Sequence, residues 1–182
     1  MPFEFEQLPI KGLVLAKVKT FPDGRGFFAE LYRSSLFRKA GLSLECCQIN
    51  HSRSAQGVLR GLHYQLKPQT QAKLVQVLAG EIFDVAVDIR KGSATFGRWF
   101  GVRLSGENHA ALFIPEGFAH GFCVLSPSAD VIYCCSKEYA PECERGIIWN
   151  DPAIAIDWPV PDPAVSDKDA AWPTLNSAEI NL

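Results

Sequence analysis

The clearest periodic pattern in the chain is a two-residue alternation of apolar and polar side chains. It is strongest over residues 83–89, where four apolar residues alternate with two aspartates and an alanine. Successive side chains of a strand point to opposite faces, so this pattern predicts a half-buried strand. The apolar run Leu74–Leu78 precedes it, and Ala79-Gly80 between the two is a turn candidate. We therefore expect the two runs to pair as a β-hairpin.

Further short apolar runs follow at regular spacing, each bounded by Gly, Pro, Ser or Asp. They cover Trp99–Leu104, Ala110–Ile114, Phe122–Leu125 and Val131–Cys135. Short, regularly spaced strands are typical of an all-β sandwich or barrel. No internal repeat, low-complexity tract or linker-like stretch interrupts the pattern. The sequence therefore predicts a single β-rich domain over residues 1–182.

One short helix is expected in the first half of the chain, at Leu36–Ala40. Ser34 or Ser35 precedes it as the candidate N-cap, and Gly41 follows as the C-terminal stop. A helix of this length cannot bury a large face. We expect it to be a surface connector.

The last part of the chain is rich in proline from Asp151 onward. The prolines are Pro152, Pro159, Pro161, Pro163 and Pro173. Because proline cannot donate a hydrogen bond to a β-ladder, this composition argues against central strands. The segment is predicted to be an extended tail that wraps the barrel, with a short helix near Asp167–Ala171.

Composition and charge narrow the classes of function. Of the 182 residues, 47% are hydrophobic, and 18 Lys plus Arg against 20 Asp plus Glu give a net charge of −2. This balance lacks the basic face typical of nucleic-acid binding, and no apolar run approaches the ~20 residues of a membrane span. Residues 1–11 carry Glu4 and Glu6 and no signal-peptide core. We expect a cytoplasmic protein with neither a nucleic-acid nor a membrane partner.

The six cysteines form two adjacent pairs and two single residues. They are Cys46, Cys47, Cys123, Cys134, Cys135 and Cys143. No Cys-x-x-Cys spacing occurs, which makes zinc and thioredoxin-like interpretations weak. Neighbours in a strand point to opposite faces, so each adjacent pair would place one thiol inside and one outside. We predict reduced, packed cysteines.

Two histidines lie in polar-studded, strand-rich stretches, His63 within Arg60–Gln65 and His120 within Pro115–Phe122. The Pro-x-Gly-x-x-His spacing that ends at His120 resembles the second motif of the cupins, whose jelly roll holds functional residues inside its barrel. In metal-binding cupins the first motif supplies two histidines spaced one apart and a carboxylate, but here His63-Tyr64-Gln65 stands in that place. A metal site needs three or four convergent ligands. We therefore expect no metal and no cofactor.

Several longer blocks occur in order along the chain. They are Asp23–Glu30, Gln48–Ser52, Gly57–Gln65, Lys73–Val75, Ile114–Phe122, Tyr133, Tyr139–Glu142, Trp149–Pro152 and Ser166–Asp169. With these blocks the chain, from about Leu13 to Pro173, closely resembles the dTDP-4-dehydrorhamnose 3,5-epimerases, a family of metal-free cupin enzymes. The resemblance implies an all-β fold: a cupin double-stranded β-helix (jelly-roll) barrel with short peripheral helices and an extended C-terminal tail.

The resemblance also implies a reaction, the inversion of C3 and C5 of dTDP-4-dehydro-6-deoxy-D-glucose to give dTDP-4-dehydro-L-rhamnose, which supplies activated rhamnose for surface polysaccharide. An epimerase acting beside a ketone must remove a proton from carbon, hold the enolate and return a proton to the opposite face. By family position His63 is the base and Asp169 orients its ring. Lys73 stabilises the enolate, and Tyr133 delivers the proton from the other side.

Because the chain has a net charge of −2, the negative charge of a diphosphate must be balanced by individual basic side chains at its binding site. Arginine has the geometry for that task. Arg25 and Arg60 are the candidates by family position. The other substrate-binding residues that the resemblance implies are Phe28, Glu30, Gln48, Asn50, His120, Tyr139, Glu144 and Lys168. Phe28 and Tyr139 resemble the aromatic contacts for base or sugar, and Glu30 resembles the acid that reads the thymine edge. In several family members one such segment comes from the partner subunit, so a homodimer is implied.

Taken alone, these residues also fit ordinary structural roles. A tyrosine in an apolar strand, such as Tyr133, usually belongs to the core, with its hydroxyl on a backbone carbonyl. A lysine that opens a strand, such as Lys73, is most often solvated, and Asp169 also fits a plain acid of a helical turn. His51 and His109 lie next to small or polar residues, and we interpret them as surface or hydrogen-bonding histidines.

Other functions remain open. The stretch Cys134-Cys135-Ser136 departs from the family, which more often has a lysine followed by threonine or serine. Relatives with nearly the same residues epimerise only C3 or only C5, and others act on differently substituted sugars. The alternatives are a mono-epimerase or ketoisomerase of another dTDP-deoxysugar pathway, a non-catalytic cupin that binds sugar nucleotides, and a metal-dependent cupin enzyme.

Overall fold

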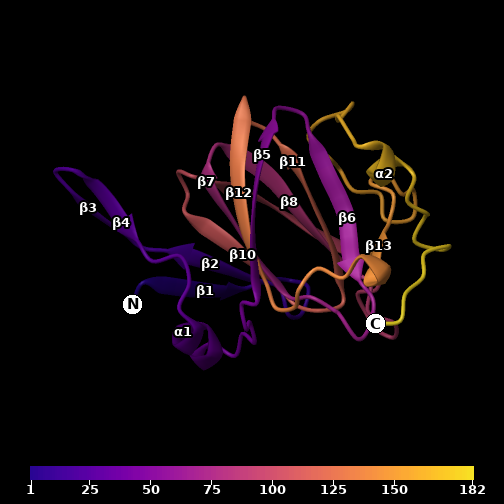
Figure 1. Cartoon of the computed structure of the whole chain (residues 1–182), viewed down its shortest axis with the longest axis horizontal. Coiled ribbons are helices and arrows are strands. Elements are labelled where there is room, and N and C mark those ends of the chain that lie inside the picture. Colours follow the sequence, from indigo (N-terminus) through magenta and orange to yellow (C-terminus); the bar gives the residue numbers. More distant parts are fainter.

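The computed structural model describes residues 1–182 and consists mainly of antiparallel strands in two large sheets (Figure 1). The six-stranded sheet has the order β1 (Phe3–Gln7), β2 (Val14–Val18), β10 (Ala110–Ile114), β7 (Lys73–Ala79), β12 (Ser128–Cys135) and β5 (Gln48–Ala55). The five-stranded sheet has the order β13 (Glu144–Gly146), β6 (Leu59–Gln65), β11 (Phe118–Val124), β8 (Glu81–Asp88) and β9 (Trp99–Ser105). The two sheets form the predicted all-β jelly-roll barrel of the cupin type.

The main core lies between the two sheets. Leu112 and Val75 from the six-stranded sheet pack in one apolar cluster with Ile82, Leu104 and Phe122 from the five-stranded sheet. All are at most 3% exposed. Burial of a side chain of this size stabilises the fold by about 1.5–3 kcal/mol. This cluster holds the sheets together beside the polar part of the barrel interior.

Strands β7 and β8 exist where the apolar runs predicted them, but they do not form a hairpin. β7 pairs with β10 and β12, whereas β8 pairs with β11 and β9. The connection at Gly80, with φ 81°, crosses from one sheet to the other, and a Cβ at this position would lie 2.1 Å from the carbonyl oxygen of Ser128. The hairpin prediction was wrong because alternation identifies a strand without identifying its partner.

Strand β8 is also buried on both faces, which corrects the prediction of a half-buried strand. Ile82 and Ala86 point into the core between the sheets, while Val85 and Val87 pack in a second cluster on the outside of the barrel. Asp84, on the polar side of the alternation, has no exposed surface. The polar row therefore faces the barrel interior and the apolar row lies beneath another layer.

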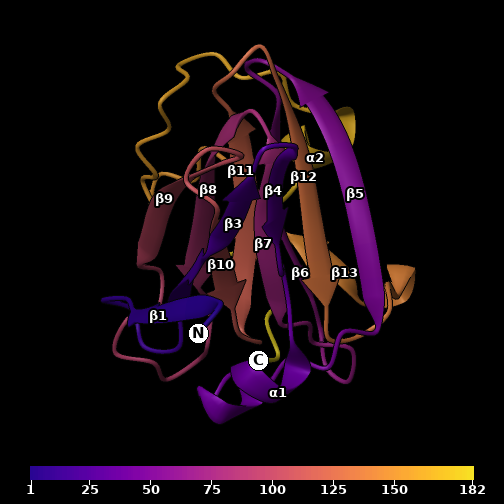
Figure 2. The ribbon, with the colours of Figure 1, turned by 90° about the vertical axis from the view of Figure 1, so that its left-hand side faces the viewer.

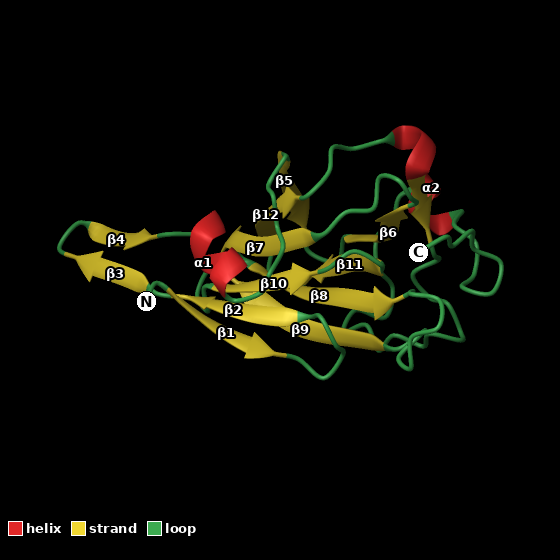
Figure 3. Ribbon diagram, turned by 90° about the horizontal axis from the view of Figure 1, so that it is seen from below, coloured by secondary structure: helices red, strands yellow, loops and turns green.

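That layer is the C-terminal tail. Ile147, Ile154, Leu175 and Ile180 are buried against apolar residues of β6, β8 and β11. A 3-10 turn η1 (Pro141–Cys143) and β13 precede the tail, in which the only regular element is the short helix α2 (Asp167–Ala170), and Figure 3 shows the tail at the end of the molecule opposite β3 and β4. The predicted extended, wrapping tail and its short helix are confirmed.

The first helix, α1 (Ser34–Lys39), lies in the expected region but begins two residues before the predicted start at Leu36. Its N-cap residue is Arg33, and no side chain caps it, so the predicted serine N-cap was wrong. Gly41 has φ 78° and ends the helix as predicted. Phe37 is fully buried against Phe3 and Phe5 in a cluster on the outer face of the six-stranded sheet, so α1 is packed on that sheet and is more than the expected surface connector (Figure 2). Neither helix has the length and apolar character needed to cross a membrane.

A two-stranded hairpin of β3 (Thr20–Asp23) and β4 (Gly26–Ala29) projects away from the barrel (Figures 1 and 3). It carries two exposed aromatic side chains, Phe27 at 61% and Phe28 at 67% of their full exposure. Exposed aromatic side chains on a protruding element are more typical of an interaction surface than of a solvated turn.

Candidate active site

The polar part of the barrel interior opens as two adjoining cavities of about 270 and 310 Å³. Four side chains line both: His63, Lys73, Tyr133 and Glu144. The first cavity is also lined by Gln48, Asn50, Tyr64, Gln65, Gln71, Cys135 and Tyr139, and the second by Arg60, His120, Phe122, Ser166, Lys168 and Asp169. Because four residues are shared, we treat the two cavities as one site.

His63 and Asp169 form the first hydrogen-bonded pair of the site. The Nε2 atom of His63, on β6, lies 2.6 Å from Oδ1 of Asp169, on α2. Asp169 is 4% exposed and also accepts hydrogen bonds from the Gly61 amide and the Trp172 indole. Burial alone would raise the pKa of Asp169, but these donors, His63 first among them, hold it below its ordinary value. An ionised Asp169 requires a proton on Nε2, which leaves Nδ1 of His63 as the free basic nitrogen.

A register shift in β6 brings Arg60 and His63 to the same cavity. In a regular strand, residues three apart face opposite sides. Here His120 of β11 pairs with His63 while Phe122 pairs with Arg60, with an irregularity between them. Gly61, at φ 129°, lies so close to β11 that a Cβ would approach the Gly121 Cα to 2.5 Å. The glycine therefore permits the bulge that presents both side chains.

A second pair, His120 and Asp84, lies deeper in the barrel. The Nε2 atom of His120 is 2.8 Å from Oδ1 of Asp84, and both side chains are buried. Burial lowers the pKa of His120, although the Asp84 carboxylate opposes this shift. The other Asp84 oxygen, Oδ2, has no hydrogen-bond partner. Sequence reasoning missed Asp84, and the signal that contained it was the polar row of the β8 alternation.

Lys73 opens β7 and points into the cavity rather than into solvent. It lines both parts of the site together with His63 and Tyr133. Burial lowers the pKa of its amine from the ordinary value, and the carboxylates of Asp84 and Glu144 partly oppose this shift. An ammonium group in such surroundings interacts strongly with a developing negative charge.

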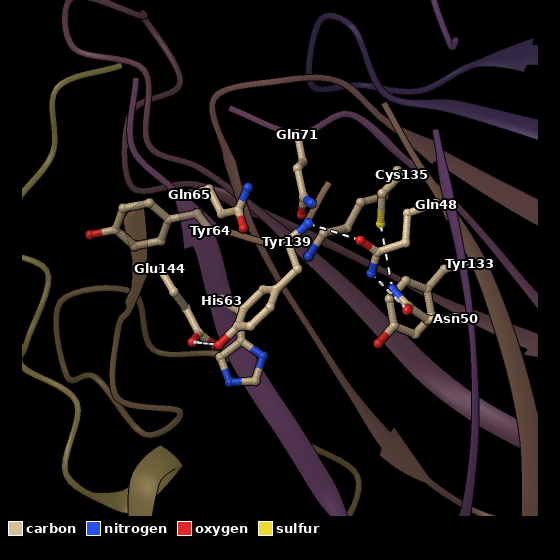
Figure 4. A pocket seen from close by; sticks show the side chains of 11 residues that line it. Gln48, Asn50, His63, Tyr64, Gln65, Gln71, Tyr133, Cys135, Tyr139 and Glu144 are labelled. Atoms are coloured by element: carbon tan, nitrogen blue, oxygen red, sulfur yellow. Dashed lines mark hydrogen bonds between the residues drawn. The ribbon is translucent and has the colours of Figure 1, made fainter. Parts of the chain in front are cut away.

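Tyr133 faces the same cavity from the six-stranded sheet, opposite the five-stranded sheet that carries His63. It lies on β12, where it pairs with Asn50 of β5 and Val75 of β7. Burial raises the pKa of its phenol, so the hydroxyl keeps its proton at neutral pH. His63 and Tyr133 thus enter the cavity from opposite walls (Figure 4).

A chain of polar contacts forms the wall beside Tyr133. The Gln48 amide nitrogen donates to Oδ1 of Asn50 at 2.8 Å, and Nδ2 of Asn50 lies 3.9 Å from the Cys135 sulfur (Figure 4). Cys135 therefore faces the cavity, whereas its neighbour Cys134 packs on the outer side of the sheet against the cluster around α1. This inside-and-outside placement was predicted for the pair, and all six cysteines are free. Gln65, Gln71 and Cys135 line the cavity, and sequence reasoning did not assign them to the site.

Three side chains meet at the mouth of the cavity. Oε2 of Glu144 accepts hydrogen bonds from the Tyr139 hydroxyl at 2.5 Å and from Nζ of Lys168 at 2.6 Å. The backbone amide of Tyr139 donates to Oε1 of Gln48 at 2.8 Å. The loop before η1, the strand β13 and the helix α2 are thereby joined around the opening.

Three of the expected substrate-binding residues do not reach this cavity. Arg25 and Phe28 belong to the projecting β3–β4 hairpin, and Glu30 directly follows it. Arg25 pairs with Asp23 at 2.6 Å, and its side chain is 90% exposed, while Glu30 pairs with Arg33. The structure thus brings together the other residues that the sequence singled out, and places this group elsewhere.

The remaining predictions concern His51, His109 and the metal site. Nε2 of His51 lies 2.7 Å from Asp130 on the outer face of the six-stranded sheet, in agreement with a hydrogen-bonding surface histidine. His109 occupies a turn with φ 48°. No group of three or more His, Cys, Asp or Glu side chains is arranged to hold a metal ion.

The chain is similar to known proteins over most of its length. A protein-family model described as dTDP-4-dehydrorhamnose 3,5-epimerase matches residues 7–177. A dTDP-4-dehydrorhamnose 3,5-epimerase from Shigella flexneri is 55% identical over 161 residues, covering 88% of this chain and 89% of the relative.

Solved structures show the same similarity. A dTDP-6-deoxy-D-glucose-3,5-epimerase from Legionella pneumophila, in complex with dTDP-4-keto-L-rhamnose, is 51% identical with a TM-score of 0.93, and covers 96% of this chain and 94% of that one. A 3'-monoepimerase from Streptomyces bikiniensis, in complex with dTDP-quinovose, is 37% identical with a TM-score of 0.89, and covers 94% and 87% of the two chains.

Proposed function

The chain belongs to the dTDP-4-dehydrorhamnose 3,5-epimerase family, and from this premise we propose that it inverts C3 and C5 of dTDP-4-dehydro-6-deoxy-D-glucose. The product is dTDP-4-dehydro-L-rhamnose, and the reaction belongs to dTDP-rhamnose biosynthesis. The chain is thus an isomerase, and the proposal concerns its substrate and the residues that carry out the proton transfers.

The placement of His63 and Tyr133 on facing sheets is the observation that supports this proposal most directly. Inversion requires that a proton leave one face of the sugar ring and return to the other. An imidazole with a free Nδ1 on one wall and a protonated phenol on the opposite wall meet this requirement. A hydrolase or a simple binding protein has no need of such opposed groups.

The first step is proton abstraction. Nδ1 of His63 removes the proton from the carbon next to the C4 ketone, and Asp169 stabilises the imidazolium through its hydrogen bond to Nε2. The electron pair moves to the C4 oxygen, and the Lys73 ammonium stabilises the enolate. Tyr133 then donates its proton to the opposite face of the same carbon. Exchange of both groups with solvent restores them before the second carbon reacts.

The substrate contacts divide between the cavity and the projecting hairpin. Arg60 and Lys168 supply positive charge near the diphosphate, and Gln48, Asn50 and His120 supply hydrogen bonds. Tyr139 covers the sugar. The metal-free mechanism uses only these side chains and needs no cofactor.

We place Arg25, Phe28 and Glu30 in the site of a second copy of the chain. The hairpin that presents them projects from its own barrel and carries exposed phenylalanines. A homodimer in which each hairpin extends to the partner would complete both sites, with Arg25 on the diphosphate and with Phe28 and Glu30 on the thymine.

Solvent exchange tests the proposal. The purified protein is incubated with dTDP-4-dehydro-6-deoxy-D-glucose in D2O, and deuterium at C3 and C5 is followed by NMR, with His63→Ala and chelator-treated samples in parallel. We expect deuterium and inversion at both carbons, no turnover by His63→Ala, and no effect of the chelator. A His63→Ala protein that keeps more than a few per cent of the activity would contradict the assignment of the base.

A mono-epimerase is the second candidate, because the Streptomyces bikiniensis 3'-monoepimerase shares the fold at 37% identity. The same experiment separates the two. Exchange and inversion at a single carbon would identify a mono-epimerase, and a shift of the keto group would identify a ketoisomerase. A protein that binds the nucleotide sugar without any exchange would be a binding cupin.

A further inference from the structure

Glu144 occupies a position at the cavity mouth that substrate binding alone does not explain. One of its carboxylate oxygens, Oε2, accepts from both the Tyr139 hydroxyl at 2.5 Å and the Lys168 ammonium at 2.6 Å. Its side chain is only 15% exposed, whereas that of Lys168 is 53% exposed. In the structure both hydrogen-bond partners of Glu144 are side chains of its own chain.

The backbone fixes Glu144 beside the proposed base. β13 pairs with β6 so that Glu144 lies opposite Gln65 and Gly146 lies opposite His63. The carboxylate consequently lines the same cavity as His63, and Figure 4 shows it with the Tyr139 hydroxyl next to the imidazole. Its place in the strand pairing fixes the position of Glu144 relative to β6.

The neighbour that matters most is α2, because the same helix carries Lys168 and Asp169. The helix has only four residues, Asp167–Ala170, so its own backbone hydrogen bonds stabilise it weakly. Lys168 reaches Glu144 on β13, and the adjacent Asp169 reaches His63 on β6. Two consecutive side chains therefore attach α2 to two paired strands.

We propose that Glu144 is a positioning residue of the catalytic site, which holds α2 through Lys168 so that Asp169 meets His63, and which holds Tyr139 across the cavity mouth. The proposal rests on the proposed function for its kinetic consequences only. Glu144 acts through its neighbours and does not touch the reacting atoms. Loss of the carboxylate would let α2 shift, and misplacement of a catalytic group by about 1 Å can reduce a rate about 100-fold.

Three variants and one matched control test the inference. Glu144→Ala removes the oxygen that accepts both hydrogen bonds, and Glu144→Gln keeps an oxygen acceptor but loses the charge. Lys168→Met removes the same Glu144–Lys168 ion pair by changing its partner on α2. The control is Glu179→Gln, since Glu179 pairs at 2.8 Å with Arg145 of the same strand β13 but lies on the surface, with 61% of its side chain exposed.

The first readout needs no substrate. In protein with 15N-labelled histidine, the proton that His63 Nε2 shares with Asp169 is followed as a downfield NMR resonance, assigned by its loss in His63→Ala. We expect this resonance to shift or broaden in Glu144→Ala and in Lys168→Met, and to be unchanged in the control. An unchanged resonance in both variants overturns the proposal, whatever sugar the enzyme uses.

The second readout separates kcat from KM. We expect Glu144→Ala to lower kcat by about 10- to 100-fold, with Glu144→Gln retaining several-fold more activity and the effects of Glu144→Gln and Lys168→Met less than additive. A rise in KM with an unchanged kcat would make Glu144 a substrate contact and overturn the proposal. If Glu144→Ala does not fold, Glu144→Gln and Lys168→Met carry the same test, and normal resonance and kcat in both overturn it.

Discussion

The carboxylate of Asp169 lies 2.6 Å from the imidazole of His63, although 106 residues separate the two in the chain. One belongs to a central strand of the barrel wall and the other to a short helix in the C-terminal tail. Ser166 caps that helix by accepting from the Asp169 amide, and the Gly61 amide donates to the Asp169 carboxylate. Docking of the tail and assembly of the His63–Asp169 pair are therefore one structural event.

Replacement of Asp169 by Asn should be severe. The amide side chain can donate to Nε2, which favours the tautomer with its proton on Nδ1 and removes the basic nitrogen from the cavity. Loss of the orienting acid in a catalytic triad costs about 10⁴-fold in kcat, and we expect a loss approaching that size in an initial-rate assay. Asp167→Asn, on the exposed side of the same helix, is the control. Activity of Asp169→Asn within tenfold of wild type would contradict the proposed role.

Replacement of Tyr133 by Phe should separate proton exchange from inversion. His63 can still remove a proton and return a deuteron to the same face, but the opposite face has lost its donor. We expect deuterium to enter the substrate in D2O while formation of the inverted product falls by at least about 100-fold. Tyr32→Phe is the control, because the Tyr32 hydroxyl donates to the Leu44 carbonyl outside the cavity. Unchanged inversion by Tyr133→Phe would show that another group is the acid.

Some residues of the site could be predicted from the sequence, and others could not. His63 and His120 stand in polar stretches between apolar strands, and the resemblance to a family named the remaining catalytic groups. Asp84 was passed over because alternation does not tell which face of a strand becomes the barrel interior. That assignment depends on the tail. Its residues cover the apolar row of β8, although they lie 60 or more positions further along the chain.

The pairing of strands was the other feature that the sequence did not reveal. Leu74–Leu78 and residues 83–89 are adjacent in the chain, and their spacing is that of a hairpin, yet they belong to different sheets. The choice between a hairpin and a crossing is made by long-range packing of each strand against its partners. Likewise, the bulge that brings Arg60 and His63 into one cavity depends on the contact of Gly61 with β11.

Gly61→Ala should therefore destabilise the protein strongly. Alanine is strained at φ 129°, and its Cβ would meet the backbone of Gly121 at 2.5 Å. We expect a loss of at least about 2 kcal/mol in the free energy of unfolding, measured by urea denaturation. Gly57→Ala separates the two causes, because Gly57 has φ 78° but no atom within 4 Å of a built Cβ. Equal losses in the two variants would show that the close approach to β11 contributes nothing.

Asp88 should make stability depend on pH in the acid range. Burial opposes its ionisation, but hydrogen bonds from Arg90, Ser93 and Thr95 lower its pKa from 3.8 to about 2. Because the folded pKa lies below the unfolded one, this stabilisation is complete above about pH 4 and is lost as the pH falls toward 2. The difference corresponds to about 2 kcal/mol.

The measurement is the free energy of unfolding of wild type and Asp88→Asn between pH 7 and pH 2. We expect the wild type to lose stability more steeply below pH 4, so that the two curves converge. Asp162→Asn, at an exposed position, should follow the wild-type curve. Parallel curves for wild type and Asp88→Asn over the whole range would show that the Asp88 carboxylate has the same pKa in both states.

Mixed dimers test whether the projecting hairpin serves the partner's site. If Arg25 of one subunit completes the cavity that contains His63 of the other, Arg25→Ala and His63→Ala subunits damage different sites when they pair. A heterodimer then keeps one intact site, and random pairing of equal amounts should restore about a quarter of wild-type activity. His63→Ala mixed with Asp169→Asn is the control, since both changes lie in the same chain's cavity wall and no intact site can form. Co-refolded mixtures with no more activity than their separate components would show that Arg25 acts in its own subunit or not at all.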